Sequence, residues 1–95
     1  MSWSSEHREF NPDWTIHPGE TLRKVIRVQG LTQRYVAEQV GISQKYLSEI
    51  VNGHALYSAR LAVSFARLLG SSPQFWWNLR CNYELDLALG RKVMH

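Results

Sequence analysis

Four polar side chains near the middle of the chain have the spacing of one outer helix face. Gln44 and Lys45 come first, and Ser48 and Glu49 follow one turn later. Three of the four can donate hydrogen bonds, and none is bulky and apolar. Such side chains at the start of a helix match the hydrogen-bonding edges of bases in the major groove of DNA. These residues are therefore the candidate base contacts, with an ordinary solvated helix face as the alternative interpretation.

The elements that would position this face are two short helices between Gly30 and Gly53. Thr32 and Ser43 are expected to cap them through side-chain oxygens, and Gly41 is expected to end the first helix in a left-handed conformation. The small side chain of Ala37 would let the second helix cross closely over the first. Apolar residues spaced by three and four form the predicted inner faces, namely Val36, Ala37, Val40, Leu47, Ile50 and Val51. The pattern predicts a helix-turn-helix motif over residues 32–52.

Three further helices are expected around this motif. The first begins at His17-Pro18-Gly19-Glu20, where proline fits the first turn, and ends at Gly30. The fourth is capped by Ser58 and the fifth by Ser72. The fifth should run to about Leu89, although the alternating leucines at its end are also compatible with a strand. Its predicted apolar side is formed by Phe75, Trp76, Leu79 and Tyr83.

The domain organisation predicted from these elements is simple. Residues 1–16 lack a helical period and should form an extended N-terminal arm whose aromatic side chains pack back onto the body, with a frayed terminus as the alternative for residues 1–9. Residues 17–90 should form one helix-turn-helix domain. The chain of 95 residues has room for a single modest core.

Charge and composition narrow the function. The net charge of +3 comes entirely from residues 17–60, which hold six basic and three acidic residues, and this favours an anionic partner there. The single cysteine, Cys81, favours a reducing, cytoplasmic setting, and no apolar run is long enough to span a bilayer. The histidines have no metal-ligand spacing, and no nucleophile elbow or phosphate loop occurs. We therefore expect no catalytic residues, no metal, no cofactor and no membrane association.

The sequence resembles HigA-type antitoxins, within the phage-repressor-like (XRE, lambda-repressor-like) helix-turn-helix family. The resemblance covers roughly residues 10–87. It is carried by Asn-Pro-Asp-Trp at 11–14, His-Pro-Gly-Glu-Thr-Leu at 17–22, the motif at 30–53 and Ser-Pro-Gln-Phe-Trp-Trp-Asn-Leu at 72–79. It implies an all-α, five-helix lambda-repressor-like domain that binds double-stranded DNA, dimerises and represses its own operon. It also implies a toxin partner with ribonuclease activity.

By position, the resemblance assigns base contacts to Gln44, Lys45 and Glu49, and Ser48 is a candidate because it shares their helix face. The candidate phosphate contacts are Thr32, Gln33, Arg34, Tyr46, Asn52 and Arg60. Gln33 would begin a helix whose free N–H groups also attract phosphate. His54 departs from the family, which usually has Lys or Arg after Asn-Gly, so a backbone contact is expected to be weaker there.

Three hypotheses for function remain at this stage. The first is a homodimeric, sequence-specific repressor of a palindromic operator, with Trp77 and Tyr83 as candidate dimer contacts; a core position is the alternative for Trp77. The second is an antitoxin that masks a toxin, for which a phage-encoded regulator without a toxin partner is the alternative. The third is an adaptor module, and it is the least favoured because it does not explain the positive charge concentrated in residues 17–60.

Overall fold

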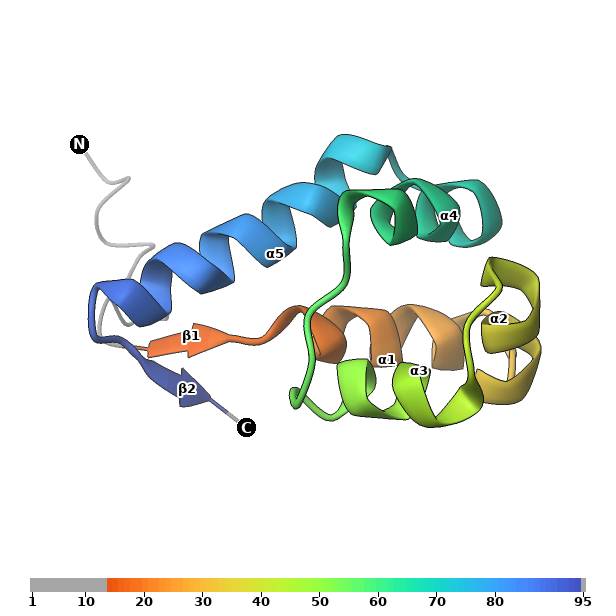
Figure 1. Cartoon of the computed structure of the whole chain (residues 1–95), viewed down its shortest axis with the longest axis horizontal. Helices are drawn as coiled ribbons and strands as arrows, with labels where there is room; N and C mark the ends of the chain where they lie inside the picture. Colours follow the sequence, from red (N-terminus) through yellow and green to blue (C-terminus); the bar gives the residue numbers. More distant parts are fainter. Residues whose placement is uncertain (1–13, 95) are drawn as a thin grey trace.

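The computed structural model describes residues 14–94, which form five helices and two short strands (Figure 1). The all-α, five-helix prediction is confirmed. The expected arm lies outside the described residues, except for Trp14 to Ile16. In chain order the elements are β1 (Trp14–Ile16), α1 (Pro18–Val28), α2 (Gln33–Val40), α3 (Gln44–Val51), α4 (Ala59–Leu69), α5 (Pro73–Ala88) and β2 (Lys92–Met94).

Four of the helices begin at a hydroxyl side chain, as predicted. Each hydroxyl oxygen accepts a hydrogen bond from the backbone N–H three residues later, and each such cap is worth about 1 kcal/mol. The four cap residues are Thr32, Ser43, Ser58 and Ser72. α1 begins differently, because His17 makes no side-chain cap and Pro18 occupies the first helical position.

The core lies between two layers of helices. α1 and α3 form one layer, α4 and α5 form the other, and α2 closes one end (Figure 1). The largest fully buried side chains are Trp76, Tyr57 and Phe65. The rings of Tyr57 and Phe65 meet edge to face at 5.2 Å between centroids, and the Tyr57 hydroxyl donates to the Trp76 carbonyl oxygen at 2.6 Å. This aromatic cluster joins the loop after α3 to both α4 and α5.

Both chain ends of the described region meet in a two-stranded parallel sheet that the sequence analysis did not predict. Trp14 pairs with Lys92, Thr15 with Val93 and Ile16 with Met94. Asp86 of α5 holds this sheet, because it accepts a hydrogen bond from Thr15 at 2.8 Å and forms an ion pair with Arg91. Strands of three residues are too short to give a period, and their pairing depends on residues at opposite ends of the sequence.

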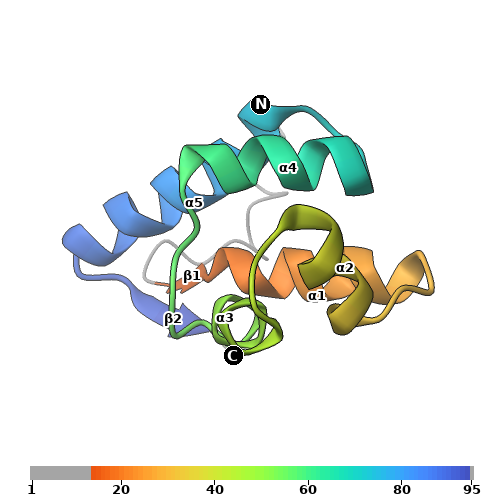
Figure 2. The same cartoon turned by 45° about the vertical axis from the view of Figure 1, so that its right-hand side comes forward.

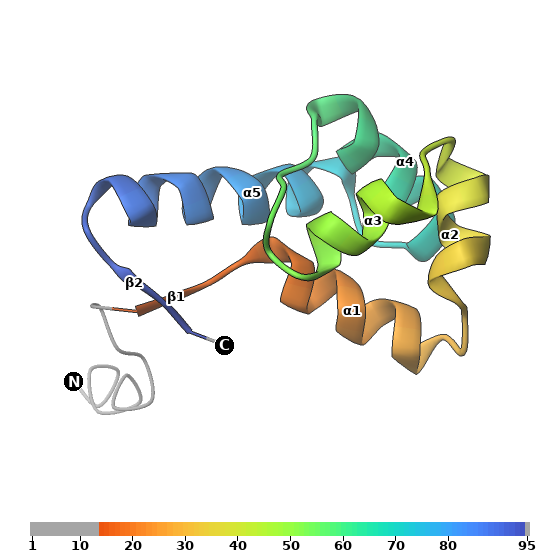
Figure 3. The same ribbon diagram turned by 60° about the horizontal axis from the view of Figure 1, so that its bottom comes forward.

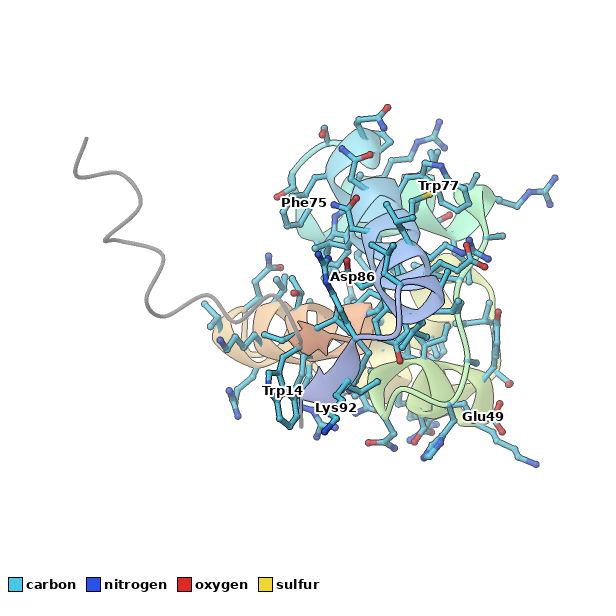
Figure 4. The ribbon with its side chains drawn as sticks, turned by 90° about the vertical axis from the view of Figure 1, so that its left-hand side faces the viewer. Trp14, Glu49, Phe75, Trp77, Asp86 and Lys92 are labelled. Atoms are coloured by element: carbon cyan, nitrogen blue, oxygen red, sulfur yellow. The ribbon has the colours of Figure 1, made fainter. Side chains whose placement is uncertain are left out.

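Trp14 does not pack back onto the helical body as expected. Its side chain is 37% exposed, and the Lys92 ammonium lies 6.0 Å from the centre of its ring (Figure 4). In a strand, successive side chains point to opposite faces, and here Thr15 takes the inner face.

The predicted apolar side of α5 needs one correction. Trp76 and Tyr83 are buried and Leu79 is partly buried, but Phe75 is 40% exposed. Phe75 precedes Trp76 by one residue, which rotates it about 100° around the helix and away from the core. The helix itself runs to Ala88 and is capped by Leu89, so the helical prediction for this segment is confirmed over the strand alternative.

Candidate nucleic-acid interface

The two helices of the motif cross as the sequence predicts. Gly41 ends α2 in the left-handed conformation at φ 79°, and its N–H donates to the Ala37 carbonyl oxygen. In Figure 2, where α3 is seen nearly end-on, α2 lies across it. Ala37 is buried between them, and a larger side chain there would push the helices apart. The inner residues of α3, which are Leu47, Ile50 and Val51, are all buried.

The outer face of α3 carries the four candidate base contacts. Gln44 and Lys45 are exposed in its first turn, and Ser48 and Glu49 are partly exposed one turn later. Glu49 points outward from α3 in Figure 4. The face is polar, protrudes from the body and begins at the positive end of the helix dipole. Such a ridge can enter the major groove with its N-terminal side chains foremost.

The candidate phosphate contacts at the start of α2 differ in their availability. Thr32 is exposed, but its hydroxyl oxygen already accepts from the Tyr35 N–H as a helix cap. Gln33 is the first residue of α2 and is partly exposed. Arg34 is exposed and pairs with Glu38 at 3.6 Å, in a solvated ion pair that contributes little to stability. Gln33 and Arg34 are therefore both free to meet a phosphate.

The other phosphate candidates lie on α3, at its C-terminal cap and on α4. The hydroxyl of Tyr46 donates to the Leu56 carbonyl oxygen at 3.0 Å, and its ring packs against the core. This side chain therefore holds the loop after α3. The backbone N–H of Tyr46 already donates to the Ser43 hydroxyl oxygen, so both donors of Tyr46 are engaged within the protein. Arg60 is exposed in the first turn of α4. Asn52, which ends α3, is held by two side-chain hydrogen bonds, from Arg23 and to Ser48.

Arg23 is the residue beside this surface that the sequence analysis did not assign. One terminal nitrogen of its guanidinium, Nη2, donates to Oδ1 of Asn52 at 2.8 Å, and its Nε pairs with Glu20 at 3.3 Å. The sequence does contain one signal for a basic residue at this place, which is the group of outward-facing basic side chains in the first predicted helix. The sequence pattern cannot show which of them meets α3, because Arg23 and Asn52 lie 29 residues apart.

The two candidate dimer contacts separate in the structure. Trp77 is partly exposed, with the Arg80 guanidinium 5.0 Å from the centre of its ring. Tyr83 is only 8% exposed and packs its ring edge-on against His17. Tyr83 therefore belongs to the core of the protomer, and Trp77 alone remains as an interface candidate. The reason is the turn of α5, which points Tyr83 towards α1.

The described residues also bear on other classes of site. Within residues 14–94, no three His, Cys, Asp or Glu side chains lie close enough together to hold a metal ion. None of the helices in the same range combines the length and apolar character needed to cross a bilayer.

Comparison with protein families gives the relationship directly. The family model described as helix-turn-helix matches residues 22–76, which is more than half of the chain and includes the whole of α2 and α3. The chain belongs to the helix-turn-helix family. It is a HigA-type member, since solved structures at about 30% identity include HigA and other antitoxins. Members of this group are regulators without enzymatic activity.

Three solved structures illustrate the similarity. A Pseudomonas aeruginosa protein in complex with its 18 bp operator DNA is 32% identical, with a TM-score of 0.73 over 78% of this chain and 81% of that one. An addiction module antidote protein of the HigA family from Coxiella burnetii is 30% identical, with a TM-score of 0.69 over 77% and 80%. The antitoxin GraA is 29% identical, with a TM-score of 0.71 over 76% and 78%. No curated protein sequence matches the chain significantly.

Proposed function

We propose that this chain is a sequence-specific transcriptional repressor that binds DNA through α3. The observation that carries the proposal is the exposed pair Gln44 and Lys45 at the first turn of a helix whose other side is fully buried. That arrangement presents hydrogen-bonding side chains on a rigid support, as base recognition requires. The similar Pseudomonas aeruginosa protein that was solved with its operator DNA supports operator binding by this chain.

The chemistry of the four side chains gives each a preferred base. Gln44 can bond adenine through both ends of its amide, and Lys45 can donate to guanine O6 and N7. Glu49 accepts hydrogen bonds, so cytosine, with its exposed amino group, is its preferred partner. Gln33 lies at the N-terminus of α2, where free backbone N–H groups add to the attraction for a phosphate. In this proposal α3 discriminates among sequences and α2 anchors the protein to the backbone.

We further propose that the functional unit is a homodimer on a palindromic operator. A single helix of eight residues contacts too few base pairs to discriminate one site in a genome. Two copies related by a two-fold axis would bind two half-sites about 34–36 Å apart, which is one turn of DNA. Trp77, partly exposed on α5, is our candidate for the contact between copies.

We also propose that the protein is the antitoxin of a HigBA-type toxin-antitoxin operon, with a ribonuclease toxin as its second partner. Its similarity to the Coxiella burnetii HigA-family protein and to GraA supports this assignment. Such a protein would be cytoplasmic and nucleoid-associated, in a bacterium or encoded by a phage. The alternative is a phage regulator without a toxin. A toxin-like reading frame beside the gene favours the antitoxin, and a lone gene among phage genes favours the regulator.

Selection of bound oligonucleotides from a random duplex pool tests the DNA-binding proposal. We expect enrichment of a palindrome with half-site centres about 10 base pairs apart. A parallel selection with Gln44→Ala should lose preference at one position of each half-site. A pool that stays random after repeated rounds would contradict sequence-specific binding, and an enriched site without symmetry would contradict the homodimer.

A further inference from the structure

The N-terminal half of α1 packs tightly against the C-terminal end of α3. A Cβ atom added at Gly19 would lie 2.0 Å from the Ile50 carbonyl oxygen and 2.7 Å from that of Val51. The two backbones therefore touch, and only glycine permits this approach. Figure 3, in which the bottom of the molecule comes forward, shows α1 running beside α3. Side chains from the next turn of α1 are consequently held at the edge of the proposed DNA surface.

Arg23 comes from that next turn and reaches the end of α3. Its Nη2 donates to the Asn52 side-chain oxygen at 2.8 Å and lies 3.5 Å from the Val51 carbonyl oxygen, while its Nε pairs with Glu20 at 3.3 Å. These contacts fix the plane of the guanidinium although the side chain is 43% exposed. Within residues 14–94 the Nη1 hydrogens have no acceptor, so this nitrogen remains available as a donor.

Asn52 supplies a second donor at the same place. Its amide oxygen accepts from Arg23, so its amide nitrogen points towards Ser48, at 3.3 Å from the serine oxygen. That bond uses one of the two amide hydrogens, and the other has no acceptor among residues 14–94 although Asn52 is exposed. Nη1 of Arg23 and the amide nitrogen of Asn52 together present N–H donors to the oxygens of a phosphate group, and the donor on Arg23 is charged.

The position favours the DNA backbone over a base. In the proposed mode, the first turns of α3 reach the bases. Asn52 lies at the opposite end of α3, as its C-terminal cap, and Arg23 reaches this end from α1. Arg23 also offsets the partial negative charge that the helix dipole places at this end of α3, which would otherwise repel a phosphate. The ion pair with Glu20 is solvent-exposed and too weak to compete strongly with a phosphate.

We propose that Arg23 and Asn52 form a phosphodiester-binding site at the end of α3, so that α1 contributes directly to DNA binding. This inference rests on the proposed function, since it assigns an additional contact to the same DNA surface. It also gives Asn52 a role that depends on Arg23, because without the guanidinium the amide keeps only its longer hydrogen bond to Ser48.

The test compares Arg23→Gln with the control Arg67→Gln, which removes the same charge from an exposed position on α4. Binding to the selected operator and to a random duplex is measured across salt concentrations. For Arg23→Gln we expect the slope of log K against log salt to become shallower by about 0.9 per protomer for the lost phosphate contact. Operator and random DNA should weaken by a similar factor, whereas Arg67→Gln should keep the slope of the unaltered protein. Arg23→Lys, which keeps the charge, should retain most of the slope.

A scan with neutral methylphosphonates locates the contact. Replacing one phosphate per half-site should weaken the unaltered protein and Arg67→Gln, but should have no further effect on Arg23→Gln. An unchanged slope and an unchanged set of sensitive phosphates in a folded Arg23→Gln would overturn this inference, as would an Arg23→Lys slope as shallow as that expected for Gln. If the unaltered protein binds no duplex, the proposed function fails first, and the phosphate site fails with it.

Discussion

At the scale of single residues, two glutamines on neighbouring helices are expected to act differently. Gln44 is exposed on the outer face of α3, whereas Gln33 is partly exposed at the first position of α2. Replacing Gln44 by Ala should relax sequence preference and cost about 1–3 kcal/mol at one base pair. The measurement is binding to a panel of operators that each carry a single base change.

Gln33→Ala is the matched control, because it removes the same amide group from the neighbouring helix. It should weaken every sequence about equally, since phosphate contacts carry no sequence information. If both variants weaken specific and random DNA in the same ratio, the assignment of Gln44 to a base is wrong.

A buried tyrosine makes stability depend on alkaline pH. Tyr57 is 1% exposed, and burial raises the pKa of its hydroxyl well above the usual value of about 10, although the Arg80 guanidinium acts in the opposite direction. Above pH 10 the unfolded chain loses this proton while the folded chain keeps it. This residue should therefore lower the free energy of unfolding as the pH rises above 10, with a slope that approaches about 1.4 kcal/mol per pH unit once the unfolded chain is fully ionised at this position.

Urea denaturation at a series of alkaline pH values measures this loss, and Tyr57→Phe is the control. The Phe variant loses the hydrogen bond to Trp76 and is expected to be less stable at neutral pH. Its stability should nevertheless fall less steeply above pH 10, because it lacks the hydroxyl of Tyr57. Parallel curves would show that Tyr57 titrates normally in the folded chain.

At the scale of elements, the close contact between α1 and α3 should be sensitive to one methyl group. Gly19→Ala places a Cβ against two carbonyl oxygens of α3, so the helices must separate. We expect a loss of roughly 1–3 kcal/mol in stability. In a domain of this size the melting temperature would fall by about 4–8 °C for each kcal/mol. Thermal unfolding followed by circular dichroism measures the change.

Thr21→Ala is a suitable control, since Thr21 lies two residues further along α1 and is partly exposed. It should change stability by less than about 0.5 kcal/mol. Gly19→Ala should also weaken DNA binding, because α3 moves with the contact. A Gly19→Ala protein with native stability and native affinity would show that the helices do not depend on this approach.

At the scale of the whole molecule, substitution of Trp77 tests whether two copies of the chain form a dimer through α5. It is partly exposed on α5, whereas Phe75, also exposed, points to a different side of the same helix (Figure 4). If Trp77 joins two copies, Trp77→Asp should shift the protein towards monomer, because a charge in an apolar interface is costly. Phe75→Asp should leave the assembly unchanged. Sedimentation velocity over a range of concentrations distinguishes the two states.

Circular dichroism of the same samples separates an interface role from a core role. A folded, monomeric Trp77→Asp protein supports the interface, and an unfolded one assigns Trp77 to the core of the protomer. A folded Trp77→Asp protein that remains dimeric would exclude this contact between copies.

The sequence by itself determined the features that arise between near neighbours in the chain. The caps at Thr32, Ser43, Ser58 and Ser72 and the left-handed end at Gly41 each involve residues three or four apart. The inner and outer faces of α3 follow from the helical repeat in the same way. Family membership was also recognisable, because its motifs are continuous segments of sequence.

Only the tertiary structure decided which distant residues meet. The pairing of β1 with β2, the contact of Arg23 with Asn52 and the hydrogen bond that engages the hydroxyl of Tyr46 could not be obtained from spacing. The same holds for the burial of Tyr83 against His17. Local patterns specify which face of a helix is apolar, but the neighbour of each side chain depends on how the helices pack. That packing is fixed by contacts among all of the elements together.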